Sequence, residues 1–120
     1  MNIAKVGKVD QTGATGAEIL VDALAAEGVD TIFGLPGVQL DYIFDALYAR
    51  QDAIRVIHTR HEQATAYMAF GYAQVTGRVG TCLVVPGPGV LNATAALSTA
   101  YACNACLLYT SDAADDLTRV

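Results

Sequence analysis

Apolar and polar positions follow a helical period first and then a strand-like run. Residues 16–27 carry apolar side chains every three or four positions, which is the stripe of an amphipathic helix. Thr15 and Glu18 have the spacing of a capping box at its start, and Gly28 ends it. Residues 31–33 favour a strand and run into a Gly-Leu-Pro-Gly turn. This part of the chain predicts a helix, a strand and a loop.

The order of strand, loop and helix then repeats twice. The pattern predicts helices over about 40–50, 62–75 and 90–102, and strands over 54–58 and 81–85. The 81–85 run is almost entirely apolar, as in a parallel strand buried on both faces. The sequence therefore predicts an α/β fold, with a parallel sheet and helices on both faces. Right-handed crossovers place the loops that follow the strands at one edge, where open α/β sheets bind ligands.

Composition narrows the class of protein. The chain has 120 residues, enough for one small domain, and 53% are hydrophobic against 16% charged, which excludes a disordered chain. A net charge of −5 gives no support to nucleic-acid binding. No secretory signal is visible, and nothing in the three cysteines argues for disulfides, so we expect a reducing, cytoplasmic location.

Residues 79–111 contain no charged side chain, a run long enough to span a bilayer. The Pro-Gly-Pro-Gly sequence at 86–89 would break a spanning helix near its start. We therefore predict a buried strand, a turn and a buried helix here rather than a membrane span.

Three short motifs could suggest sites, and each is weak. His61-Glu62 begins a zinc-protease pattern, but the second histidine position is Thr65, so we predict no metal ligands. The loops at 34–37 and 86–89 could cradle phosphate, yet neither fits a dinucleotide or Walker motif, and tight turns explain them. The Cys-x-x-Cys at 103–106 lacks two further zinc ligands.

Several blocks taken together resemble the thiamine-diphosphate-dependent enzymes, in particular acetolactate synthase, benzoylformate decarboxylase and their relatives. The resemblance extends from about Gly16 to Ala105. The blocks that carry it are Gly34-Leu35-Pro36-Gly37, Arg60-His61-Glu62-Gln63-Ala64, Met68-Ala69-Phe70-Gly71-Tyr72-Ala73, Thr76-Gly77 and Gly87-Pro88-Gly89-Val90-Leu91-Asn92.

The resemblance implies that this is the α/β domain that binds the aminopyrimidine ring of thiamine diphosphate. Glu62 matches the catalytic acid that hydrogen-bonds a ring nitrogen, favours the imino tautomer and so activates the thiazolium C2. Without the resemblance, Glu62 would be read as an acid that complements a helix dipole. The expected cofactor-binding residues are Pro36, Gly37, Glu62, Pro88, Gly89 and Asn92.

The family also implies parts that are absent here. Its members carry a middle domain and a third domain that holds Mg²⁺ and the diphosphate. The expected whole enzyme is an acetolactate synthase-like transferase or 2-keto acid decarboxylase, a homodimer or homotetramer, and the fragment itself is expected to be inactive. A stand-alone Rossmann-like nucleotide-binding or phosphate-binding module, and a non-catalytic interaction domain, are the alternatives.

The last residues carry a separate resemblance. Residues 106–116 read like one translated frame of a transposon-end adapter used to prepare DNA sequencing libraries. We therefore expect a C-terminally truncated pyrimidine domain over 1–105 and a non-native tail over 106–120, with no strand after the last helix. A polar C-terminal tail is the alternative interpretation.

Overall fold

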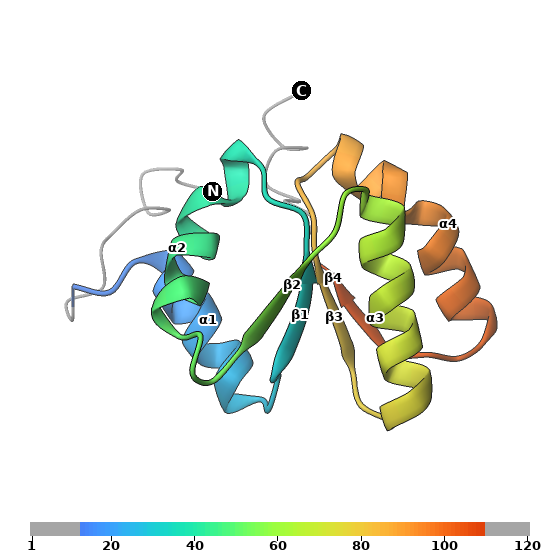
Figure 1. The fold of residues 1–120 in the computed structure, drawn as a ribbon, viewed down its shortest axis with the longest axis horizontal. Helices are drawn as coiled ribbons and strands as arrows, with labels where there is room; N and C mark the ends of the chain where they lie inside the picture. Colours follow the sequence, from blue (N-terminus) through green and yellow to red (C-terminus); the bar gives the residue numbers. More distant parts are fainter. Residues whose placement is uncertain (1–12, 110–120) are drawn as a thin grey trace, which may run out of the picture.

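A computed structural model of the protein describes residues 13–109 (Figure 1). Its elements in chain order are α1 (Gly16–Ala26), β1 (Thr31–Gly34), the 3₁₀ turn η2 (Val38–Leu40), α2 (Asp41–Ala49), β2 (Arg55–His58), α3 (Glu62–Thr76), β3 (Gly80–Leu83), α4 (Pro88–Ala102) and β4 (Leu107–Tyr109).

The four strands form one parallel sheet in the order β2-β1-β3-β4. In its register, Ile32 of β1 lies between Val56 of β2 and Thr81 of β3. All four residues of β3 are buried, as expected for a parallel strand covered on both faces. The parallel sheet predicted from the sequence is therefore confirmed.

Helices cover both faces of the sheet, which confirms the predicted fold class. In Figure 1, α1 and α2 lie on one side of the strands, and α3 and α4 lie on the other. The first side buries larger side chains, including Val21, Leu47 and Ile54. The second side is built mainly from small residues: Ala66, Ala69, Ala93 and Ala96. Such small side chains let α3 and α4 approach each other and the sheet closely.

The capping box predicted for the first helix is confirmed. The Thr15 hydroxyl accepts a hydrogen bond from the Glu18 N–H at 3.2 Å, and the Glu18 carboxylate accepts one from the Thr15 N–H at 2.6 Å. This reciprocal pair is a capping box, and it satisfies two N–H groups that the helix leaves free. Gly77 closes α3 with a φ of 68°, a left-handed conformation that favours glycine.

Two boundaries differ from the sequence prediction by two residues. β3 ends at Leu83 rather than at Val85, and Val84 and Val85 continue into the loop before α4. The Leu83 carbonyl accepts a hydrogen bond from the Leu35 N–H at 3.1 Å, the last such bond toward β1. α4 begins at Pro88 rather than Val90, because proline is well suited to the first position of a helix.

The expectation that no strand follows the last helix is wrong. Residues 107–109 form β4, which pairs with β3 in register Gly80–Leu107 to Cys82–Tyr109. The Gly80 N–H also donates to the Cys106 carbonyl at 3.1 Å. The sequence of this segment, Leu-Leu-Tyr, is apolar and suited to a strand, which explains why it pairs with β3.

The uncharged stretch that raised the question of a membrane span is divided among β3, a turn, α4 and β4. Among the helices that the structure describes, none combines the length and apolar character needed to cross a bilayer.

Candidate active site

Two of the predicted site residues meet at the carboxyl edge of the sheet. Glu62 is the first residue of α3, directly after the loop that leaves β2, and its side chain is half-buried. Asn92 lies in the early part of α4, after the loop that leaves β3. The Asn92 side-chain amide donates a hydrogen bond to Glu62 Oε2 at 3.1 Å. The structure thus joins an acid and an amide that are 30 residues apart.

The loop before Glu62 is fixed by local hydrogen bonds. His61 has an extended backbone and caps α3, because its Nδ1 accepts a hydrogen bond from the Gln63 N–H at 3.1 Å. Thr65 is fully buried, and its hydroxyl donates to the His61 carbonyl at 3.3 Å and contacts the Thr59 hydroxyl at 2.5 Å. These contacts set where α3 begins and therefore where Glu62 lies, and the positive end of the helix dipole favours its carboxylate.

The two glycine-rich loops meet at one side chain, Val85. A Cβ atom at Gly37 would lie 2.4 Å from Val85 Cγ1, and one at Gly89 would lie 2.8 Å from Val85 Cγ2. A side chain at either position would therefore require Val85 to shift. Gly87 has a φ of 72° and precedes Pro88, the first residue of α4, so this loop needs a glycine there as well.

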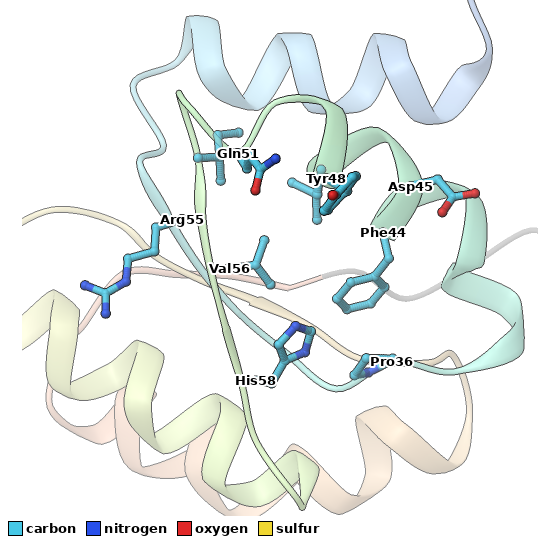
Figure 2. A pocket seen from close by; sticks show the side chains of 10 residues that line it. Pro36, Phe44, Asp45, Tyr48, Gln51, Arg55, Val56 and His58 are labelled. Carbon is cyan, nitrogen blue, oxygen red and sulfur yellow. The ribbon is translucent and has the colours of Figure 1, made fainter.

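Pro36 has a different setting from the other predicted residues. It lines an open cavity of about 570 Å³ beside the edge strand β2 and helix α2 (Figure 2). Phe44 and His58 stack in this cavity, with ring centroids 5.8 Å apart and planes 20° from parallel. Glu62 and Asn92 are not among the residues that line the cavity. Pro36 therefore lines a cavity to which Glu62 does not contribute.

The weaker motifs have separate environments. His58 stacks on Phe44, whereas His61 caps α3. Within residues 13–109, no group of three or more His, Cys, Asp or Glu side chains is arranged to hold a metal ion. Cys103 and Cys106 are exposed free thiols, and Cys82 is buried in β3.

Sequence reasoning missed the side chains that support the site. The sequence analysis assigns no supporting role to Thr65 or Val85, although a threonine within the apolar stripe of a helix is a signal of an internal hydrogen bond. Nothing in the local pattern could show that Val85 separates two glycines from different loops, because that contact depends on the packing of three elements.

The comparison with known families decides the identity of this domain. Residues 14–115 match the family model described as the thiamine pyrophosphate enzyme, N-terminal TPP binding domain. The chain belongs to this family. The family resemblance inferred from the sequence blocks is therefore confirmed, and the Rossmann-like alternative is disfavoured.

Relatives of this thiamine pyrophosphate enzyme domain include a probable decarboxylase and acetolactate synthases. A probable 2-ketoarginine decarboxylase of Pseudomonas aeruginosa is 45% identical over 101 residues, covering 84% of this chain and 18% of the relative. The acetolactate synthase of Arthrospira platensis is 46% identical over 89 residues, covering 72% of this chain and 15% of the relative. The acetolactate synthase large subunit of Haemophilus influenzae is 47% identical over 87 residues, with shares of 72% and 15%. The chain thus spans less than a fifth of each of these relatives.

The residues of the carboxyl edge fit the cofactor of this family. A half-buried carboxylate can accept a hydrogen bond from a ring nitrogen, and the adjacent amide holds that carboxylate without adding charge. The two ion pairs found among the described residues are Arg50–Asp22 and Arg78–Asp30. Glu62 takes part in neither of them.

Proposed function

We propose that this chain is the pyrimidine-binding part of a thiamine-diphosphate-dependent lyase or synthase that acts on 2-keto acids. Membership of the family supports the cofactor. The names of two relatives support the substrate class, since one is a probable decarboxylase of 2-ketoarginine and the other an acetolactate synthase. Whether the reaction joins or cleaves carbon skeletons depends on parts of the enzyme outside this chain.

Within that function, Glu62 is the catalytic acid. Its half-buried carboxylate, held by Asn92 at 3.1 Å, is the observation that carries this assignment. Thiamine diphosphate supplies an electron sink for bond changes next to a keto group. The part of Glu62 is to accept a hydrogen bond from the pyrimidine ring nitrogen and so hold a proton at that atom.

In this proposal, the other predicted cofactor-binding residues lie around the pyrimidine ring of the cofactor. Gly37 lies in the loop after β1, and Pro88 and Gly89 are the first two residues of α4, which follows the loop after β3. Their packing on Val85 explains the two glycines without any ligand, so their proposed role is to shape the wall through the backbone. Pro36 belongs to the first of these loops, although its ring lines the cavity beside β2.

The remaining functions belong to other domains of the complete enzyme. We propose that Mg²⁺ and the diphosphate are held there, that the complete enzyme is a homodimer or homotetramer, and that it works in the cytoplasm. These assignments follow from the resemblance of the sequence blocks to the thiamine-diphosphate-dependent enzymes.

Glu62→Gln in the full-length enzyme tests the proposed role. Glutamine keeps the shape of the side chain but cannot stabilise a proton on the ring nitrogen. We expect exchange of the cofactor C2 proton for deuterium, followed by NMR after acid quenching, to slow by ~10²–10⁴-fold. The melting temperature should stay close to that of the wild type.

A matched control is Glu27→Gln, at an exposed acid that follows α1 at the other end of the fold. This variant should leave the exchange rate unchanged. If Glu62→Gln exchanges as fast as the wild type, Glu62 is not the catalytic acid and complements only the dipole of α3.

A further inference from the structure

The structure contains one contact at the carboxyl edge whose chemistry extends the proposed function. We infer that Asn92 is a positioning residue for Glu62: its side-chain amide holds Oε2 and leaves Oε1 to meet the pyrimidine nitrogen. This inference rests on the proposed function of Glu62. It gives Asn92 a task different from direct contact with the cofactor.

The first support is the geometry of the contact. Asn92 Nδ2 lies 3.1 Å from Glu62 Oε2, a normal distance for an N–H···O hydrogen bond. Among the side-chain hydrogen bonds of residues 13–109, this is the one in which Glu62 takes part. A glutamate has three rotatable side-chain bonds, so a single fixed partner strongly reduces the directions its free oxygen can take.

The second support is the rigidity of the two helices that carry the pair. α3 and α4 pack through fully buried alanines, with Ala66, Ala69 and Ala96 at 0% exposure. The Tyr67 hydroxyl also contacts the Thr99 hydroxyl at 3.3 Å, further along the same two helices. Alanine side chains have no rotamers to adjust, so the two helices pack closely here, and this packing brings α4 near the start of α3, where Asn92 reaches Glu62.

The third support is the choice of donor. A lysine or arginine would hold the carboxylate equally well, but it would also compete by charge for the proton that Glu62 must keep near the cofactor. A neutral amide donates a hydrogen bond and does not titrate. Asn92 therefore orients the carboxylate and leaves its charge available.

A purely structural role for Asn92 makes a different prediction. Asparagine has a lower helix propensity than alanine, and Asn92 is exposed within α4. If it were only a solvated residue, Asn92→Ala would keep or raise the melting temperature and leave cofactor activation unchanged. The positioning role predicts that the cofactor C2 proton exchanges more slowly in Asn92→Ala while the melting temperature is preserved.

The test is a double-substitution cycle in the full-length holoenzyme, with Asn92→Ala, Glu62→Gln and the combined variant. We expect Asn92→Ala to slow exchange of the cofactor C2 proton by about tenfold, the effect of losing one hydrogen bond to a charged group. In the Glu62→Gln background, Asn92→Ala should have little further effect, because the carboxylate on which it acts is gone.

A second measurement needs no cofactor. In the ligand-free enzyme labelled with ¹³C-glutamate, the Glu62 carboxyl signal, assigned from Glu62→Gln, should shift in Asn92→Ala. Thr94→Ala is the matched control: it removes another exposed polar side chain of α4, one that bonds to the carbonyl of Val90 in its own helix. This control should change neither the signal nor the exchange rate.

The outcomes separate the two proposals. Slower exchange in Asn92→Ala that disappears in the Glu62→Gln background supports the inference. Unchanged exchange in Asn92→Ala, or a full additional effect in the combined variant, overturns it while Glu62 keeps its role. An unaffected Glu62→Gln enzyme overturns the proposed function itself. Should Asn92→Ala fold poorly, Asn92→Leu replaces it, because leucine has a similar shape but neither a donor nor a charge; wild-type exchange in that variant also overturns the inference.

Discussion

At the scale of single residues, burial separates the three cysteines into two kinds. Cys82 is 1% exposed in the middle of β3, and desolvation raises the pKa of its thiol to about 11. Cys103 and Cys106 are exposed, one at the end of α4 and the other just before β4. Cys82 therefore acts as a small buried hydrophobic residue of the core.

We therefore expect thiol reagents to distinguish Cys82 from Cys103 and Cys106. In the folded chain at pH 8, a disulfide reagent should modify Cys103 and Cys106 quickly, because thiolate is the reactive form and both are accessible. Cys82 should react only after denaturant is added. Mass spectrometry of the modified peptides measures this directly, and fast labelling of Cys82 in the folded chain would contradict its burial in β3.

At the scale of secondary-structure elements, the contact between β3 and α3 depends on one missing side chain. A Cβ atom at Gly80 would lie 2.1 Å from the Ala69 carbonyl oxygen and 2.9 Å from Leu107 Cδ2. The first neighbour is backbone in the middle of a helix, so it cannot move aside without displacing α3. Gly71 offers the reverse case, because a Cβ there meets nothing within 4 Å.

Two alanine substitutions follow from this difference. Gly80→Ala should lower the free energy of unfolding by ~1–3 kcal/mol, the usual effect of overpacking a core. Gly71→Ala, in the interior of α3, should raise it by ~0.5–1 kcal/mol because alanine is the better helix former. Urea unfolding followed by circular dichroism measures both. Equal effects of the two variants would show that β3 and α3 are not in close contact at Gly80.

At the scale of the whole molecule, the two edges of the sheet differ in their chemistry. The carboxyl edge carries Glu62 and Asn92, whereas a network of charged and polar side chains lies at the amino ends of β1 and β3. There the Asp30 carboxylate accepts hydrogen bonds from the Tyr72 hydroxyl at 2.8 Å and from the Arg78 guanidinium at 2.5 Å. Arg78 also donates to the Gly28 carbonyl. This network connects the segment before β1 to the end of α3.

Acid should loosen this network. The Tyr72 hydrogen bond, and then that of Arg78, lower the pKa of Asp30 below its ordinary value of 3.8. A carboxyl group whose pKa is lowered by folding stabilises the fold above pH 3.8, and this contribution is lost as the pH falls through the lowered value. The melting temperature of the wild type should therefore fall more steeply below about pH 4 than that of Asp30→Asn.

The pH profile needs a matched control. Asp52→Asn removes an exposed acid in the turn before β2, and Asp52 makes no side-chain hydrogen bond among the described residues. The melting temperature of this variant should fall below about pH 4 as steeply as that of the wild type. Identical acid profiles for Asp30→Asn and the wild type would show that the network does not stabilise the folded state.

Most of the fold could be predicted because its signals are local. The helical stripe before Gly28, the capping residue Thr15 and the left-handed Gly77 each specify an element or its end without reference to distant residues. The turn η2 has three residues, too few for any period to show. β4 was missed because its residues were assigned to a tail, although strand formation depends on apolar character and a free sheet edge.

The candidate site was less accessible to sequence reasoning. The position of Glu62 at the start of a helix follows from the pattern of its own segment, and the structure agrees. Its contact with Asn92 depends on how α3 packs against α4, which no single segment specifies. The cavity beside Pro36 likewise depends on the stacking of Phe44 on His58, from α2 and β2.

The placement of Val85 between Gly37 and Gly89 has a consequence for how this domain diverges. One methyl group of the valine occupies the space of a side chain at position 37, and the other occupies that at position 89. A larger residue at either glycine requires the Val85 side chain to move or to be replaced by a smaller one. We therefore expect residues at these three positions to change together among related domains, because the constraint that joins them is one of shape.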